Sequence, residues 1–237
     1  MNIPALVDAI SALDIQPRKE QWRSVTSCAV DAVWSLSSNY DTVVYPLVRR
    51  LAAPGVDPIM EPGTSAPDPL PCSAFLERFP DEESLLATAN NRQRTSSRNG
   101  ITKAAATLQF VRVLADHGIE TLSDAQIAMG DSARHAIVEA DLRRIKGDGT
   151  ESIRRNYFWM LVGADDLIKP DRMVKGWLQR YEPSVQTAAD AVEAITRVCE
   201  DPRITHTPWE IDHAIWLAER ALRQAEPRPA RVSRMLH

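Results

Sequence analysis

The sequence has few of the residues that build disulfide frameworks and metal sites. It contains three cysteines, Cys28, Cys72 and Cys199, and they are widely separated. An odd, scattered set argues against a disulfide framework and against a CxxC metal knuckle. The five histidines form no HxxxH or HxH pair. We therefore expect buried, apolar-like cysteines, no metal site and no cofactor.

Long apolar runs are missing as well. No stretch approaches the roughly 18 apolar residues that a membrane-spanning helix needs. Residues 1–15 lack a basic segment, carry Asp8 and Asp14, and have amphipathic spacing, so we predict no signal peptide and a cytoplasmic location. With 44% hydrophobic and 25% charged residues, the composition fits an ordinary globular protein with a sizeable core.

The formal net charge of −4 by itself speaks against a nucleic-acid partner, but the charges are unevenly distributed. Residues 91–114 contain basic side chains and no acid, and basic residues also gather in 143–155 and 169–180. These clusters comprise Arg92, Arg94, Arg98, Lys103 and Arg112, then Arg143, Arg144, Lys146, Arg154 and Arg155, then Lys169, Arg172, Lys175 and Arg180. Each alone could be a solvated helix face. Together they favour a polyanionic partner.

Apolar residues recur at helical spacing along most of the chain, which predicts an all-α fold. The expected helices are 4–14, 20–37, 40–52, 82–89, 101–117, 123–129, 132–144, 152–162, 171–180, 187–200 and 208–224. Thr207, Pro208 and Glu210 read as a capping box, and Ser123 and Asp131 are predicted N-caps. We expect one helical domain over 1–225 and a flexible basic tail over 226–237. The proline-rich stretch 53–71 and the polar stretch 90–100 are expected loops.

Gly147, Asp148 and Gly149 lie between two predicted helices. Two glycines at this spacing allow a tight turn that exposes backbone N–H groups, and N–H groups at a helix N-terminus bind phosphate without a side chain. The alternative is a plain helix–helix turn.

An apolar helix over 157–162, Gly163 and the segment 168–174 with Pro170 and Asp171 follow this turn. Residues 145–178 thereby resemble the helix-hairpin-helix, Gly-Pro/Asp (HhH-GPD) DNA glycosylase superfamily. Gly147 and Gly149 match its hairpin glycines, and Asp171 matches its catalytic aspartate. Residues 29–41 resemble its early helix and polar turn, and 100–114 its lysine-containing helix. The stretches KPDRMV and TPWEIDHAIW look like those of a bacterial branch. The resemblance implies a helical bundle of the HhH glycosylase type.

The resemblance also implies a reaction, in which a damaged or modified base leaves the stack and its N-glycosidic bond is hydrolysed, leaving an abasic site. Asp171 would stabilise the positive charge that develops on the sugar and orient a water molecule. The alternative is that Asp171 only caps a helix. Superfamily members with lyase activity carry a lysine just after the hairpin glycines, where this chain has Thr150, Glu151 and Ser152. We therefore expect a monofunctional enzyme.

Two groups of contact residues follow from the resemblance. The predicted phosphate contacts are Gly147, Gly149, Thr150, Ser152, Lys103, Arg98 and Arg172. The predicted base pocket or wedge comprises Trp34, Ser38, Asn39, Tyr40 and Tyr45. Trp34 has core burial as its alternative role, whereas Tyr40 lies in the polar turn. The expected partner is double-stranded DNA, with a monovalent cation at the hairpin, no membrane, and a monomeric protein.

The sequence is compatible with three hypotheses about function. The first is a glycosylase for a damaged base, or for a modified base of phage DNA in an antiviral defence. The second is a non-catalytic DNA-binding or defence-associated HhH module. The third is a helical scaffold whose resemblance is accidental.

Overall fold

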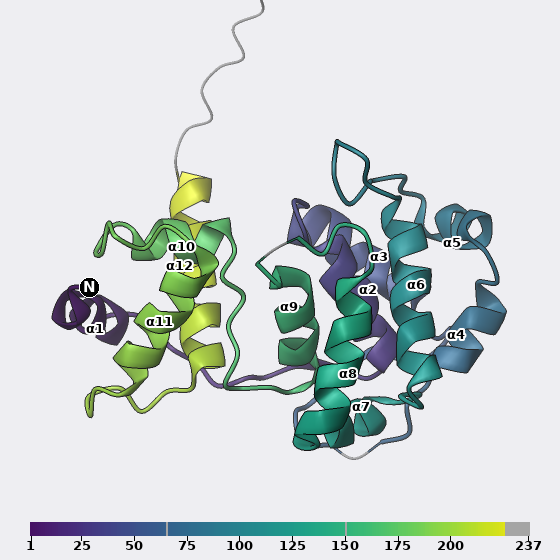
Figure 1. Cartoon of the computed structure of the whole chain (residues 1–237), viewed down its shortest axis with the longest axis horizontal. Coiled ribbons are helices and arrows are strands. Elements are labelled where there is room, and N and C mark those ends of the chain that lie inside the picture. The colour runs from purple at the N-terminus through teal and green to yellow at the C-terminus, as the bar shows by residue number, and fades with distance from the viewer. Residues whose placement is uncertain (65, 150, 226–237) are drawn as a thin grey trace, which may run out of the picture. The chain divides into compact units, whose positions relative to one another are not determined.

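A computed structural model describes residues 1–64, 66–149 and 151–225. The chain forms two compact units, a central unit from Pro17 to Lys169 and a terminal unit that joins Met1–Gln16 to the chain from Pro170 onward (Figure 1). The sequence predicted one domain over 1–225 instead. The predicted tail, 226–237, lies outside the described residues.

The central unit is mostly helical. Its elements are β1 (Gln21–Trp22), α2 (Val25–Trp34), the π-helix η1 (Tyr40–Val44), α3 (Tyr45–Leu51), β2 (Ile59–Met60), α4 (Cys72–Arg78), α5 (Glu82–Ala89), α6 (Lys103–Asp116), α7 (Leu122–Gly130), α8 (Ser132–Arg143) and α9 (Ile153–Val162).

Helix α2 lies at the centre of this unit. All its residues are buried, and it packs against α6 and α9. A helix buried all round belongs to the interior of a layered bundle. Phe110 of α6 and Phe158 of α9 meet in an edge-to-face contact with ring centroids 4.9 Å apart. The polar segments that follow α2 and precede α6 therefore extend from a rigid core.

The terminal unit contains α1 (Ile3–Ser11), α10 (Arg172–Leu178), α11 (Ala188–Cys199) and α12 (Pro208–Ala225). Helix α10 packs against α11 and α12, and α1 packs against α11. Asp8 of α1 forms an ion pair with Arg203 at 2.8 Å, which joins the N-terminal helix to the later part of the chain. Within the described part of the chain, no helix is long and apolar enough to cross a membrane.

The helical class predicted from the sequence is confirmed, with local differences. Gln21–Trp22 pairs antiparallel with Ile59–Met60, and two-residue strands are too short for alternation to reveal. Helix α4 was not predicted. The expected helix 40–52 begins as a π-helix. Cys28 and Cys72 are buried as expected, whereas Cys199 is partly exposed.

Two of the three predicted caps are confirmed. Asp131 accepts the N–H groups of Ala133 and Arg134. Thr207 and Glu210 exchange the reciprocal bonds of a capping box. The prediction for Ser123 is wrong, because α7 begins earlier, at a capping box between Thr121 and Asp124.

Candidate functional site

The connection between α8 and α9 is a hairpin built from residues with left-handed backbone. Gly147 has φ +88°, Gly149 φ +76° and Ser152 φ +55°. The N–H of Asp148 donates to the carbonyl of Ile145 at 3.3 Å. Glycine adopts these angles at little steric cost, so its presence at 147 and 149 has a direct conformational reason. Thr150, a predicted phosphate contact, lies outside the described residues.

The two hairpin glycines have different surroundings. A Cβ atom on Gly147 would overlap the side chain of Thr95, whereas a Cβ on Gly149 would meet nothing within 4 Å. Gly147 is thus packed against the loop 90–102. Gly149 faces open space, where a ligand can approach its backbone.

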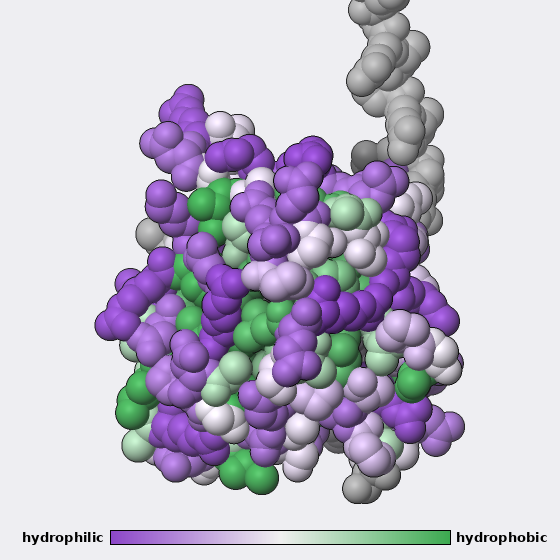
Figure 2. All heavy atoms as spheres, turned by 90° about the vertical axis from the view of Figure 1, so that its right-hand side faces the viewer, coloured by the Kyte–Doolittle hydropathy of each residue, from purple (hydrophilic) through white to green (hydrophobic). Residues whose placement is uncertain are grey.

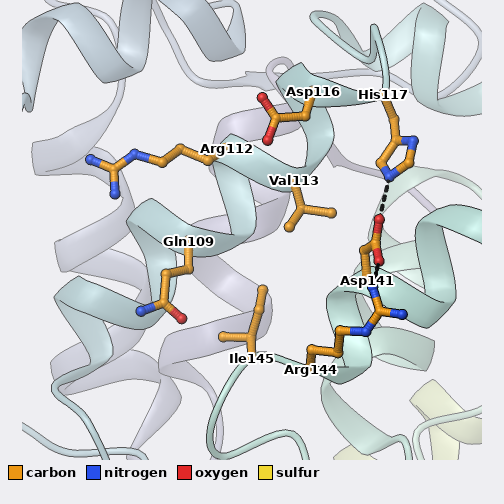
Figure 3. Close-up of a pocket in the computed structure, with 8 residues that line it drawn as sticks. All are labelled: Gln109, Arg112, Val113, Asp116, His117, Asp141, Arg144 and Ile145. Carbon is orange, nitrogen blue, oxygen red and sulfur yellow. Dashed lines mark hydrogen bonds and ion pairs between the residues drawn. The ribbon is translucent and has the colours of Figure 1, made fainter.

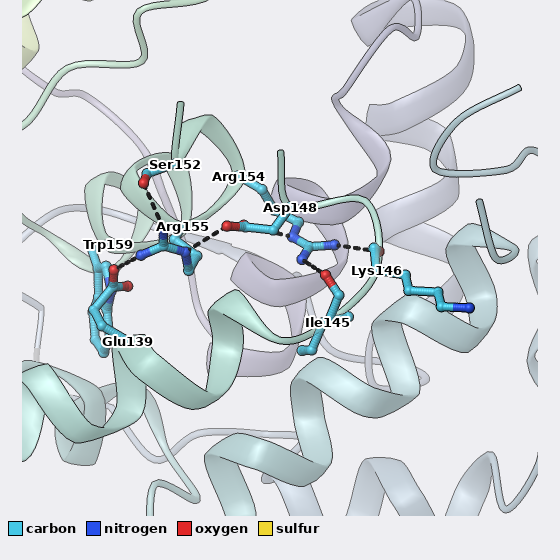
Figure 4. A network of polar contacts seen from close by, with 8 residues as sticks. All are labelled: Glu139, Ile145, Lys146, Asp148, Ser152, Arg154, Arg155 and Trp159. Atoms are coloured by element: carbon cyan, nitrogen blue, oxygen red, sulfur yellow. Dashed lines mark hydrogen bonds and ion pairs between the residues drawn. The ribbon is translucent and has the colours of Figure 1, made fainter. Parts of the chain in front are cut away.

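Arg154 of α9 stabilises the start of the hairpin from inside (Figure 4). Its side chain is fully buried and donates to the carbonyls of Ile145 at 2.9 Å and Lys146 at 3.4 Å. Its Nε lies 3.4 Å from Asp148 Oδ1. Burial lowers the pKa of Arg154. A buried cation is tolerated when it is paired and hydrogen-bonded, and these contacts supply both conditions.

Arg155 extends the same network. Its Nε donates to Asp148 Oδ2 at 2.8 Å, and its guanidinium also contacts Glu139 and Ser152 Oγ. Glu139 in turn accepts the indole N–H of Trp159 at 2.7 Å. The network ties α8, the hairpin and α9 together.

This burial corrects the predicted basic cluster at the hairpin. Arg154 and Arg155 are inside the protein and neutralised by carboxylates, so they add no positive charge to a binding surface. Arg143, Arg144 and Lys146 remain exposed.

Lys103, a predicted phosphate contact, is also an internal residue, with 3% of its surface exposed. Its Nζ donates to the carbonyls of Trp34 at 3.0 Å and Leu36 at 2.7 Å, to Ser38 Oγ at 2.8 Å and to Gln93 Oε1 at 3.1 Å. Burial, helped by the charge of Lys169, lowers the pKa of Lys103 to about 8. The prediction is therefore wrong for Lys103. The ammonium binds carbonyls at the C-terminal end of α2, where a cation is favoured.

Lys103 and Thr95 bring three polar segments together. Lys103 joins the turn 35–39 to the loop 90–102, and Thr95 of that loop packs against Gly147 of the hairpin 144–152. We call these three segments the three-loop end; they lie at the upper end of the central unit in Figure 1. Figure 2 shows that hydrophilic residues cover much of the adjoining face, with apolar residues in smaller areas between them. The exposed polar residues of the three-loop end include Ser37, Asn39, Arg92, Arg94, Arg98, Asn99 and Lys146.

The side chains of the predicted pocket and wedge residues differ in exposure and in hydrogen bonding. Ser38 Oγ is held by Lys103 and by Gln93 at 2.8 Å. Asn39 is exposed, and its side chain accepts the N–H of Thr42 at 3.0 Å as the cap of η1. Of these two residues, Asn39 is the more accessible. Trp34 is a fully buried core residue whose indole donates to Thr107 Oγ1 at 3.1 Å, which contradicts a place in the pocket wall.

A buried carboxylate that the sequence did not single out lies on α2. Asp31 Oδ2 accepts from Trp22 Nε1 at 2.8 Å, Tyr40 Oη at 3.2 Å and Tyr157 Oη at 3.5 Å. Its Oδ1 accepts from Ser35 Oγ at 2.5 Å. Burial raises the pKa of Asp31, and the hydrogen bonds only partly oppose this shift. An aspartate inside an apolar helix was the available sequence signal.

Aromatic rings surround this carboxylate, and we call Asp31 with Trp22, Tyr40, Tyr45 and Tyr157 the Asp31 cluster. The rings of Trp22 and Tyr45 have centroids 5.7 Å apart, and those of Tyr40 and Tyr45 are 6.4 Å apart. Lys169 Nζ lies 3.5 Å from the centroid of the Tyr157 ring. The structure thus brings the predicted pocket residues Tyr40 and Tyr45 together, but around a carboxylate.

Asp171 belongs to the terminal unit, where it is the N-cap of α10. Its Oδ1 accepts the N–H groups of Met173 at 2.7 Å and Val174 at 3.2 Å. The capping role that the sequence offered as an alternative is confirmed. The side chain is partly exposed at the N-terminal end of α10. Arg172, the first residue of α10, is exposed.

A surface pocket of about 330 Å³ borders the hairpin at Ile145 (Figure 3). His117 Nε2 lies 2.8 Å from Asp141 Oδ2 at one side of it, and Arg144 also contacts Asp141. The hydrogen bond from His117 lowers the pKa of Asp141. The pocket is lined by Gln109, Arg112, Val113, Asp116, His117, Asp141, Arg144 and Ile145. Its two carboxylates offset its arginines, so it is a weaker anion site than the three-loop end.

A comparison with curated proteins found no match, and neither did a comparison with solved structures. One family model matches residues 3–220, nearly the whole chain, and its description is "Domain of unknown function (DUF8548)". The chain belongs to this family.

Proposed function

We propose that this protein is a monofunctional DNA glycosylase that releases a damaged base, or a modified base such as those of phage DNA. The observation that carries the proposal is the α8–α9 hairpin, with left-handed glycines at 147 and 149, at the three-loop end.

The binding step rests on the hairpin backbone and on exposed cations. Gly149 leaves its backbone open to a phosphate, and left-handed glycines are typical where a backbone approaches a ligand closely. Arg92 and Arg98 are exposed on the adjoining loop 90–102, and Lys146 is exposed on the hairpin itself. Phosphate neutralisation by such side chains provides most of the affinity of a DNA-binding protein. A protein of net charge −4 can thus hold DNA through a local basic surface.

The base must then leave the duplex. In our proposal Asn39 fills the vacated space, because it is exposed at the end of a turn that Lys103 anchors to the core. The anchor is needed because the wedge residue must keep its position while a base is unstacked, a step that costs a few kcal/mol.

Asp171 would carry the chemistry. Cleavage of the glycosidic bond builds positive charge on the sugar, and a nearby carboxylate stabilises it. Both capping bonds of Asp171 end on Oδ1. In our proposal Oδ2 faces the developing charge.

The test is abasic-site formation in duplexes that carry damaged or modified bases, detected by alkaline strand cleavage. We expect Asp171→Asn to lower the cleavage rate by about a hundredfold or more while DNA affinity stays unchanged. Asp166→Asn, which changes an exposed carboxylate slightly earlier in the chain, is the matched control and should keep full activity.

A second candidate is a DNA-binding module without catalysis. The observation in its favour is that Asp171 already has a complete structural role as a helix cap. Salt-dependent DNA binding without abasic sites on any substrate would support this candidate over the first.

A further inference from the structure

The mechanism above makes no use of Asp31, the fully buried carboxylate of α2. We propose that Asp31 determines base specificity by accepting an N–H group from the extruded base, with the aromatic residues of the Asp31 cluster around it. This inference rests on the proposed glycosylase function and names its substrate class.

The hydrogen bonds that Asp31 accepts differ in length. Hydroxyl donors approach a carboxylate to about 2.5–2.7 Å when the bond is strong. Ser35 does so on Oδ1 at 2.5 Å, but Tyr40 and Tyr157 lie 3.2 Å and 3.5 Å from Oδ2. The bonds from these two hydroxyls to Oδ2 are therefore weak. A stronger donor from a ligand can compete with them for Oδ2.

The burial of the Asp31 carboxylate has an energetic cost. A buried carboxylate destabilises a fold unless it is fully paired, and burial raises the pKa of Asp31 in spite of its hydrogen bonds. The positive charge of Lys169 acts on Asp31, and its Nζ lies over the Tyr157 ring. Ionisable groups whose pKa is shifted by burial are concentrated at functional sites, which makes Asp31 a candidate functional group.

The exposure of the rings around Asp31 and the backbone geometry beside them also favour a binding role. Tyr40, Tyr45 and Tyr157 are only half-buried, so the aromatic layer over Asp31 reaches the surface. Tyr40 begins the π-helix η1, and single π-helical turns occur often at functional sites. In our proposal a movement of Tyr40 or Tyr157 lets the base reach the Asp31 carboxylate between the aromatic rings.

The hydrogen-bonding chemistry of the Asp31 carboxylate determines which bases can bind. An ionised carboxylate only accepts hydrogen bonds, so the base must present a donor. A ring N–H, as in the imide of uracil or at N1 of guanine, fits this requirement. A base methylated at that nitrogen would leave the buried carboxylate unpaired, and sites of this kind reject such analogues strongly.

The experiment compares two duplex pairs in binding assays with the whole protein. Each duplex holds one target nucleotide opposite an abasic analogue: deoxyuridine or its N3-methyl derivative, and deoxyguanosine or its N1-methyl derivative. We expect the wild type to prefer the N–H form of at least one pair by about tenfold or more. In Asp31→Asn the preference should fall to about twofold or less, whereas Asp57→Asn, an exposed carboxylate, should keep it. Circular dichroism and thermal unfolding check that Asp31→Asn is folded.

Tyr157→Phe provides a second variant that retains Asp31. It removes the weaker competing hydroxyl, and the preference for the N–H base should persist or increase. Equal binding of both forms in both pairs, or an unchanged preference in Asp31→Asn, would overturn the proposal. An unchanged preference in that variant would mean that the methyl group is excluded by shape alone.

A titration with free uracil and 3-methyluracil separates this inference from the proposed function. We expect uracil to shift the indole N–H resonance of Trp22, assigned with Trp22→Phe, and 3-methyluracil to leave it unchanged. This response without DNA binding would refute the glycosylase proposal but support the Asp31 site. DNA binding and base release without any donor preference would refute the Asp31 site alone.

Discussion

The backbone of Gly147 packs directly against the side chain of Thr95, so that a Cβ atom at position 147 would overlap Cβ and Oγ1 of Thr95. This contact joins the hairpin to the loop 90–102. Because the same loop is bonded through Gln93 to Lys103, the three segments proposed to hold DNA share one support.

Alanine at the two hairpin glycines should have unequal effects. Gly147→Ala adds an overlap with Thr95 to the strain of a positive φ, and should lower the free energy of unfolding by about 2–4 kcal/mol. Gly149→Ala meets open space and should cost about 1–2 kcal/mol. Urea denaturation of both variants measures the difference. Equal losses would contradict the packing of Gly147 against the loop.

Arg154→Met should destabilise the protein strongly. It leaves Asp148 with one cationic partner and removes the donors to the carbonyls of Ile145 and Lys146. Breaking a buried pair of this kind costs about 3–5 kcal/mol. Arg143→Met removes an exposed arginine of the same region, and it should change stability by about 0.5 kcal/mol or less. If both variants were equally stable, the hairpin network would not be a structural element.

Lys103→Met should weaken DNA binding without removing a phosphate contact. It deprives the turn 35–39 of its anchor, so affinity should fall while the dependence of affinity on salt keeps its slope. A slope reduced by about one would instead identify Lys103 as a direct phosphate ligand.

The difference in stability between the wild type and Lys103→Met should also depend on pH. The pKa of Lys103 is lowered from 10.5 to about 8 in the folded protein, so between these values the unfolded chain binds more protons. The free energy of unfolding of the wild type, relative to Lys103→Met, should therefore be constant below about pH 8 and rise from there to about pH 10.5. Denaturation of both proteins across this range measures it, and a flat difference would contradict the burial of the ammonium.

Asp31→Asn should reveal the cost of the buried carboxylate. Because burial raises the folded-state pKa of Asp31 above the ordinary aspartate value of 3.8, the protonated form is favoured by folding. The stability of the wild type relative to Asp31→Asn is then greatest below that value and falls as pH rises through the raised pKa. Parallel denaturation series from acid to neutral pH test this sign. A relative stability that increases with pH would show that Asp31 is stabilised as an anion.

The sequence was most informative where local rules decide the structure. The glycines at 147 and 149, the Asp131 cap and the Thr207–Glu210 capping box depend on residues close in the chain. Helical periodicity therefore located most helices. Strands β1 and β2 were not detected because two residues carry no periodicity.

The candidate site was harder to predict, because burial depends on distant partners. Lys103 and Arg154 look like surface cations in the sequence, but carbonyls and carboxylates from other segments hold them inside. Asp31 was missed for the same reason, since its donors Trp22, Tyr40 and Tyr157 come from three separate segments.

The central claim is that the protein removes a base from DNA. Mass spectrometry of bases released from genomic DNAs of varied modification, including phage DNAs, tests it most directly. We predict that the wild type releases one base bearing a ring N–H group and that Asp171→Asn releases none. If the wild type released no base from any of these DNAs, or if Asp171→Asn released it at the wild-type rate, the account would be contradicted.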